Sequence, residues 1–367
     1  MKKMLAILFA LAMLLCVTAC GDKPEENGPT PSSTTATTAG TTTVAEEVTT
    51  TTATAGETTT ATEAEVTTTT TAGTTAATES IQPTESATTA KPTTTQPTAT
   101  KPTEPPKNTG NVPKSISILS VGNSFSVDAM KNHLYPMLKE AGCTDIRLGI
   151  LYIGGASIDT HYDNIRLDRA KYDYYETVNG EWVITPEYKA STAFALTDWD
   201  IVTIQQASPD SGRPISYENL GTVIDLMRPQ IGDAKLYWHM TWAYQQDSDH
   251  SAFPNYNKDQ MRMYRGIVDA TKRRIVGNEN FVGYFPCGTS IQNLRTSSLG
   301  DTLTADGYHL KDTYGDYTAA LTWFCYLTGA DAETVAYRPA SIADHFDEIA
   351  EAVNNAIKTP LAITECK

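Results

Sequence analysis

Residues 116–126 of the chain are Ile-Ser-Ile-Leu-Ser-Val-Gly-Asn-Ser-Phe-Ser. The apolar, β-branched run up to Val121 predicts a buried parallel strand. The Gly-Asn-Ser that follows places Ser124 at the carboxyl end of that strand. In open α/β sheets, ligands bind at this edge. The stretch therefore predicts an α/β fold with a serine exposed at its functional edge.

A second motif lies near the other end of the folded part, where Asp306 precedes His309 by three residues. An aspartate at this spacing can orient an imidazole, and an oriented imidazole can activate a serine hydroxyl. Each motif is a weak signal alone. Together they make a hydrolase the leading hypothesis.

Apolar runs alternate with segments of helical periodicity along the rest of this region. This alternation predicts a five-stranded parallel sheet with helices on both faces, a flavodoxin-like three-layer sandwich. Pro136 is expected to bend or shorten the first helix. The expected strands are 116–121, 146–153, 200–205, 235–241 and 281–285, and the expected helices are 127–141, 217–227, 258–276, 314–327 and 341–357.

One segment interrupts the alternation between Tyr172 and Tyr188. Aromatic and β-branched residues there flank Asn179-Gly180, the strongest short signal for a β-hairpin. We expect an inserted hairpin that overhangs the site, with a surface ornament as the alternative.

The amino-terminal residues 1–19 predict a lipoprotein signal peptide. Positive residues precede an apolar stretch that is too short to span a bilayer comfortably. Small residues then lead to Cys20, as in a bacterial lipobox, so we expect cleavage before Cys20 and lipidation of its thiol. The anchor would hold the protein at the extracellular face of the membrane without spanning it. An ordinary signal peptide that contains a cysteine is the alternative.

Residues 20–112 are rich in threonine and nearly free of large apolar side chains. Such a segment cannot repay the entropy of ordering, which predicts a disordered stalk rather than a folded domain. A substrate-binding tail is the alternative. Residues 113–360 are long enough for one catalytic α/β domain, and residues 361–367 form a short tail.

Composition excludes some classes of partner and site. The formal net charge of −15 argues against nucleic-acid binding. The cysteines beyond Cys20 are widely separated and lack Cys-x-x-Cys spacing, so a structural zinc site is not expected and disulfide pairing is left open. The polar loop 247–250 is weak evidence for a metal. No metal or organic cofactor is expected, and the oligomeric state does not follow from the sequence.

The order and placement of these motifs resemble the SGNH (GDSL-type) hydrolase superfamily, over nearly all of residues 113–360. Within it, Gly-Asn-Ser-Phe-Ser and the run at 199–206 resemble a branch catalogued as a domain of unknown function. The resemblance implies an esterase in which Ser124 is the nucleophile, His309 the general base and Asp306 its orienting partner. The alternative is that Ser124 or Ser126 merely caps the following helix, and Ser126 is the better cap candidate.

Acyl transfer also needs hydrogen-bond donors for the developing oxyanion. The resemblance implies the backbone amide of Ser124, an amide from Gly154-Gly155, and a side-chain amide after the third strand. Glycines allow close backbone approach, although they also suit a tight turn. The superfamily carries Gly-x-Asn-Asp after the third strand, whereas this chain has Gln205-Gln206. Gln205 is the favoured donor.

Two residues after later strands are candidates for substrate binding. Trp242 follows the fourth strand and Asn293 follows the fifth, both at the expected catalytic edge. Trp242 could instead be a core aromatic, and the polar residues around Asn293 could cap a short helix.

The sequence thus predicts an extracellular, lipid-anchored serine esterase that removes acyl groups, acetyl first among them, from polysaccharide. Carbohydrate as the substrate rests on the stalk, the acidic composition and analogy with the fold. The alternatives are a non-catalytic glycan-binding module, a structural protein of the cell envelope and a lipid-acyl hydrolase.

Overall fold

A computed structural model describes residues 109–367. The predicted signal peptide, Cys20 and the predicted stalk up to residue 108 lie outside the described residues. In the described part of the chain, none of the helices has both the length and the apolar character needed to cross a membrane.

The centre of the fold is a mixed seven-stranded sheet in the order β4-β3-β2-β1-β5-β6-β7. Its five parallel strands are ordered second, first, third, fourth, fifth along the chain, as in flavodoxin-like folds. The predicted architecture is therefore confirmed. The parallel strands are β1 (Ser115–Gly122), β2 (Asp145–Tyr152), β5 (Ile201–Ile204), β6 (Lys235–His239) and β7 (Gly283–Phe285).

The central strand β1 is buried on both faces, as its near-continuous apolar sequence predicts for a strand covered by two helical layers. Ile118, Leu119 and Val121 have no exposed surface, and they belong to one continuous core. Because β1 is packed on both faces, it holds the turn at Asn123 and Ser124, which follows it, in a fixed position.

The predicted hairpin consists of β3 (Tyr172–Val178) and β4 (Glu181–Tyr188). Asn179 and Gly180 both have positive φ angles in the turn, the geometry that Asn-Gly favours. Strand β3 pairs antiparallel with β2, so the hairpin extends the sheet. The expectation that it overhangs the site is wrong. Its turn lies toward the amino end of β2, with Gly180 against the ring of Tyr135.

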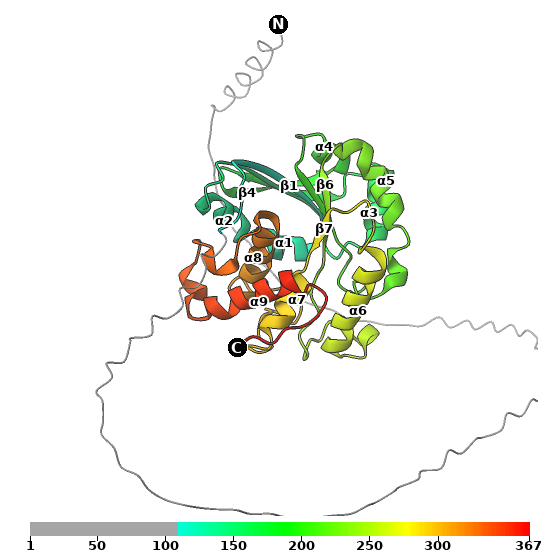
Figure 1. The fold of residues 1–367 in the computed structure, drawn as a ribbon. Helices are drawn as coiled ribbons and strands as arrows, with labels where there is room; N and C mark the ends of the chain where they lie inside the picture. Colours follow the sequence, from blue (N-terminus) through cyan, green and yellow to red (C-terminus); the bar gives the residue numbers. More distant parts are fainter. Residues whose placement is uncertain (1–108) are drawn as a thin grey trace, which may run out of the picture. The chain divides into compact units, whose positions relative to one another are not determined.

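Helices cover both faces of the sheet. Figure 1 shows α1, α8 and α9 on one side and α3, α5 and α6 on the other. The helices are α1 (Ser124–Met130), α2 (Leu134–Glu140), α3 (Ile158–Arg166), α4 (Ala190–Phe194), α5 (Leu220–Ile231), α6 (Gln260–Arg274), α7 (Cys287–Leu294), α8 (Tyr314–Thr328) and α9 (Phe346–Lys358), with short 3₁₀ turns η1 (Pro214–Tyr217), η2 (Phe253–Tyr256), η3 (Ala332–Thr334) and η4 (Ala340–His345).

The first predicted helix is divided into α1 and α2 at residues 131–133. Pro136 lies in the first turn of α2, where a missing N–H costs no intrahelical hydrogen bond. The break therefore occurs before the proline. Helices α3, α4 and α7 were not predicted as elements.

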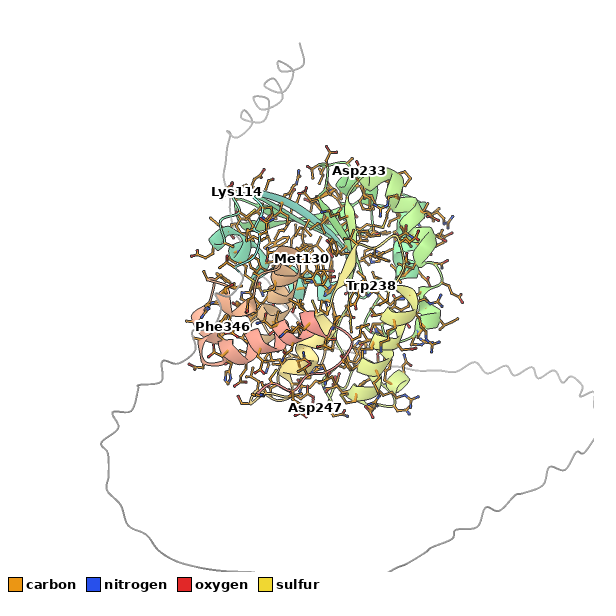
Figure 2. The ribbon with its side chains drawn as sticks, in the orientation of Figure 1. Lys114, Met130, Asp233, Trp238, Asp247 and Phe346 are labelled. Carbon is orange, nitrogen blue, oxygen red and sulfur yellow. The ribbon has the colours of Figure 1, made fainter. Side chains whose placement is uncertain are left out.

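The amino ends of the parallel strands form one edge of the sheet and their carboxyl ends form the other, and these two edges lie at opposite ends of the domain. Lys114 precedes β1 and Asp233 precedes β6, so both mark the amino edge, whereas Asp247 follows β6. Figure 2 shows Lys114 and Asp233 at the top of the view and Asp247 at the bottom. The segments that follow the strands therefore meet at the lower end, which positions the candidate site.

Candidate active site

Ser124 is the first residue of α1 and follows the end of β1 by two residues. Asn123 is the N-cap of this helix, because its Oδ1 accepts a hydrogen bond from the Phe125 N–H at 3.0 Å. The alternative in which Ser124 or Ser126 caps the helix is thus wrong. With Asn123 as the cap, the hydroxyl of Ser124 is left for another partner.

That partner is His309. The Oγ of Ser124 lies 2.8 Å from His309 Nε2, although the two residues are 185 positions apart in the chain. His309 Nδ1 lies 2.7 Å from Asp306 Oδ2. A carboxylate oxygen only accepts, so the Nδ1–H donates to Asp306 and Nε2 is left to accept the serine proton. The structure brings together all three side chains of the predicted triad.

The carboxylate of Asp306 is held in a tight turn. Its Oδ1 accepts from the backbone N–H of His309 at 2.8 Å and from that of Tyr308 at 3.2 Å. Partial burial raises the pKa of Asp306, but these hydrogen bonds and the His309 ring outweigh it and lower the pKa below its usual value. Asp306 is therefore an ionised acceptor at neutral pH.

The Gln205 side chain does not point into the site as an oxyanion donor. It is fully buried, and its Nε2 donates to Asn123 Oδ1 at 2.7 Å. Its Oε1 accepts from Ser126 Oγ at 2.6 Å and lies 2.9 Å from His239 Nδ1. Gln205 therefore supports the turn that carries the nucleophile, instead of donating to the substrate itself.

His239 was not among the predicted site residues, yet it completes this buried group. Burial lowers its pKa to about 3, so the ring is neutral at physiological pH. Since Gln205 Oε1 only accepts, the proton of His239 is on Nδ1. A lone histidine in a strand carries no sequence signal for such a role.

Gln206 is also occupied elsewhere, and the expectation that it donates to the oxyanion is not supported. Its Oε1 accepts from the backbone N–H groups of Ile158 and Ala207, and its Nε2 donates to the carbonyl oxygen and hydroxyl of Ser216. Its amide cross-links the loops after β2 and β5. Its neighbour Gln205 points the other way because successive side chains alternate along an extended chain.

Backbone donors remain for the oxyanion. Ser124 is at the first helical position, where an N–H has no intrahelical acceptor. Gly154 and Gly155 form an exposed turn after β2, with Gly155 at φ +65° and open space where a Cβ would point. Asn123 Nδ2 donates to the carbonyl of Ala156 at 3.0 Å, which attaches this turn to the nucleophile's turn.

The two predicted substrate-binding residues are both fully buried, which excludes direct contact with substrate. Trp242 stacks on Phe125 with ring centroids 4.3 Å apart, and its Nε1 donates to the carbonyl of Tyr308. Asn293 lies in α7, where Nδ2 donates to the carbonyl of Ala352 and Oδ1 accepts from Thr364 N–H. Trp242 is a core aromatic beside the site, and Asn293 fastens the carboxyl-terminal segment.

Tyr308 is a half-buried aromatic residue beside the triad. Its half-buried ring lies 4.2 Å from the ring of His309 and 4.7 Å from that of His250, centroid to centroid. Its position between Asp306 and His309 was the only sequence signal.

The cysteines of the described residues take part in no disulfide. Cys143, Cys287, Cys325 and Cys366 are free thiols. Residues 109–367 contain no group of three or more His, Cys, Asp or Glu side chains placed to hold a metal ion.

Residues 117–357 match the model of the DUF4886 family, which is described as a domain of unknown function. The crystal structure of a DUF4886 family protein from Bacteroides uniformis ATCC 8492 is 40% identical in sequence. The match covers 68% of this chain and 98% of that chain, with a TM-score of 0.65. The chain belongs to the DUF4886 family.

More distant structural neighbours of this DUF4886 domain are SGNH- and GDSL-like hydrolases and esterases. The acetyl xylan esterase AlAXEase is 15% identical, over 57% of this chain and 98% of that chain, with a TM-score of 0.38. A catalytic mutant of Axe2, an acetylxylan esterase from Geobacillus stearothermophilus, is 9% identical. The match covers 62% of this chain and 97% of that chain, with a TM-score of 0.36. No curated protein matches the chain by sequence.

Proposed function

We propose that this DUF4886 domain is a serine esterase that removes short acyl groups, acetyl first among them, from carbohydrate. The observation that carries the proposal is the continuous hydrogen-bonded series from Ser124 Oγ through the His309 ring to the Asp306 carboxylate. An activated serine next to a base that is itself oriented by a third group is the arrangement that nucleophilic acyl transfer requires.

The proposed reaction has two halves. His309 Nε2 takes the hydroxyl proton as Ser124 Oγ bonds to the ester carbonyl carbon. The bond to the alcohol oxygen then breaks, His309 returns the proton to that oxygen, and the acyl group stays on Ser124. Water attacks the acyl-enzyme with its proton passing to His309, and the carboxylic acid leaves as Ser124 regains its proton. General base catalysis contributes on the order of 10²- to 10⁴-fold.

We further propose that the backbone N–H groups of Ser124 and of the Gly154-Gly155 turn bind the developing oxyanion. Both are at the carboxyl edge of the sheet, next to the nucleophile. The loss of one such donor costs about 3 kcal/mol of barrier in acyl-transfer enzymes. No side-chain amide takes part directly, because Gln205 and Gln206 are both bonded elsewhere.

A small acyl group suits the packing below the nucleophile. Phe125, the residue after Ser124, stacks on Trp242 at an interplanar angle of 3°, and both rings are buried. We propose that these rings leave no room for a long acyl chain beside Ser124. On the open side, the half-buried ring of Tyr308 offers an apolar face beside His309, as ligand sites commonly do. This favours acylated sugar over a lipid ester.

The localisation is a proposal from the sequence. We propose that Cys20 carries a lipid anchor and that the threonine-rich segment before residue 109 holds the domain at the extracellular face of the bacterial membrane, where acylated polysaccharide is its substrate.

Release of p-nitrophenol from p-nitrophenyl acetate by the full chain tests the esterase activity. We expect Ser124→Ala to lower the rate by about 10³-fold or more. Ser115→Ala, a change at the other end of β1, is the matched control and should keep the wild-type rate. Equal rates for wild type and Ser124→Ala would favour a non-catalytic glycan-binding module. Longer p-nitrophenyl esters cleaved faster than the acetate would favour a lipid-acyl hydrolase.

A further inference from the structure

The distance between Ser124 and His309 depends on two segments that are remote in sequence. Ser124 belongs to α1, whereas His309 lies in a loop at 304–310 that closes on itself through a bridge between Thr304 and Leu310. The side chain of His309 is 31% exposed, so packing alone does not hold it. Further hydrogen bonds are therefore needed to hold the 304–310 loop in position relative to α1.

Most of the loop's attachments come from the segment after β6. Trp242 Nε1 donates to the Tyr308 carbonyl at 2.8 Å, and Gln245 N–H donates to the Gly307 carbonyl at 2.8 Å. Gln245 Oε1 also accepts from the hydroxyl of Thr304. These bonds hold the loop to a segment that does not carry the nucleophile.

Asp128 makes the direct connection. Its Oδ2 accepts a hydrogen bond from the backbone N–H of Leu310, the residue after His309, at 2.9 Å. Within residues 109–367, two hydrogen bonds join α1 to the 304–310 loop, and the other is the Ser124–His309 bond itself. Asp128 is four residues after Ser124, so the two side chains lie on the same face of the helix, one turn apart.

The position of the Asp128 carboxyl costs free energy, because it is half-buried and lies near a second carboxylate. Burial raises the pKa of its carboxyl to about 6, although the Leu310 N–H and the nearby His309 lower it, and the negative charge of Asp306 raises it further. A half-buried carboxylate close to a second carboxylate costs free energy, which the hydrogen bond from Leu310 N–H offsets in part.

We propose that Asp128 is a positioning residue, which fixes His309 at proton-transfer distance from Ser124 by holding Leu310 N–H on the nucleophile's own helix. This inference rests on the proposed esterase activity for its kinetic consequence, but the hydrogen bond and its effect on the loop do not. Asp128 touches no substrate in this proposal. Because a displacement of about 1 Å in a catalytic site can cost on the order of 10²-fold in rate, the effect on turnover should be large.

The test compares Asp128→Ala with Asp128→Asn in the full chain. Asparagine keeps an acceptor oxygen for Leu310 N–H and alanine does not. With p-nitrophenyl acetate, we expect Asp128→Ala to lower kcat about 10- to 100-fold with KM nearly constant, and Asp128→Asn to recover most of that loss. Asp331→Ala is the matched control. It removes a half-buried carboxylate that accepts the Glu333 N–H outside the catalytic edge, and it should keep the wild-type kcat.

Amide hydrogen exchange of the peptide that covers 304–311 gives a readout independent of activity. Asp128→Ala should speed exchange there, whereas Asp128→Asn and Asp331→Ala should not. If the wild type hydrolyses nothing but exchange responds in this way, the proposed function fails and the positioning role stands. If Asp128→Ala does not fold, Asp128→Glu replaces it, since it keeps the acceptor but moves it by one methylene and should also lower kcat. The proposal is overturned if kcat and exchange stay at wild-type values in the alanine or glutamate variant, or if asparagine is as damaging as alanine.

Discussion

The side-chain amide of Gln205 donates to Asn123 Oδ1 at 2.7 Å, and this hydrogen bond joins the end of β5 to the turn that presents Ser124. Asn123 in turn caps α1 and donates to the carbonyl of Ala156. The buried side-chain amide of Gln205 therefore holds the turn that carries the nucleophile. Gln205, which the sequence predicted as a direct oxyanion donor, instead holds this turn in place.

We predict that Gln205→Leu destabilises the domain and lowers turnover. The change removes one of the two donors to Asn123 Oδ1, and it removes the acceptor of the Ser126 hydroxyl and of His239 Nδ1–H. Leaving buried polar groups unpaired costs about 1–3 kcal/mol each. Urea unfolding and the rate with p-nitrophenyl acetate measure the two effects. An unaltered unfolding midpoint would mean that the network contributes nothing.

We predict that Asp306→Asn lowers kcat by about 10²- to 10⁴-fold with little change in the binding of an unreactive ester analogue. Asparagine no longer favours the tautomer with the proton on His309 Nδ1, which leaves Nε2 less able to accept the proton of Ser124. The comparison is kcat against the inhibition constant of the analogue. Wild-type turnover would show that another group orients the ring.

We predict that Tyr308→Ala raises KM more for an acetylated oligosaccharide than for p-nitrophenyl acetate. The half-buried Tyr308 ring beside His309 is expected to contact a sugar ring, whereas the small synthetic ester depends mainly on the groups that bind its acyl end. Steady-state kinetics with both substrates measure the difference. An equal rise for the two substrates would argue that Tyr308 acts through the position of His309 instead.

We predict that Asp316→Asn stabilises the domain, and does so increasingly as pH rises. Burial, followed by the nearby charge of Asp128, raises the pKa of the Asp316 carboxyl from 3.8 to about 8, although a hydrogen bond from Asn132 lowers it. The folded state therefore holds a proton that the unfolded state releases. The stability that Asp316 contributes is complete below about pH 4 and is lost as pH rises to about 8.

Thermal unfolding from pH 4 to pH 9 checks this. The Tm of the asparagine variant should exceed that of wild type by a margin that grows up to about pH 8 and then levels off. Each kcal/mol of removed penalty corresponds to about 2–4 °C for a domain of this size. A margin that is independent of pH would mean that Asp316 does not change its protonation between the folded and unfolded states.

Elements with a strong local pattern were predictable from the sequence. The parallel strands follow from apolar runs, and the hairpin follows from Asn179-Gly180, whose positive φ angles few other residue pairs accept. Helix α7 was missed for a physical reason. All of its residues are buried, polar ones such as Gln292 and Asn293 included, so its polar residues do not mark a solvent-exposed face. Helix α3 had a local signal, the capping box of Ser157 and Thr160.

The triad residues could be identified from the sequence because Ser124 lies in a short motif directly after β1 and Asp306 precedes His309 by three residues. The supporting residues did not. Whether Gln205 points toward the substrate or beneath Asn123, and whether Trp242 is a wall of the site or part of its core, depends on side chains from several strands that meet in space. Asp128 faces Leu310 only because the sheet order brings α1 beside a loop encoded 182 residues later. Local sequence determined which groups could react, and only tertiary packing, which acts between segments remote in the chain, decided what holds them in place.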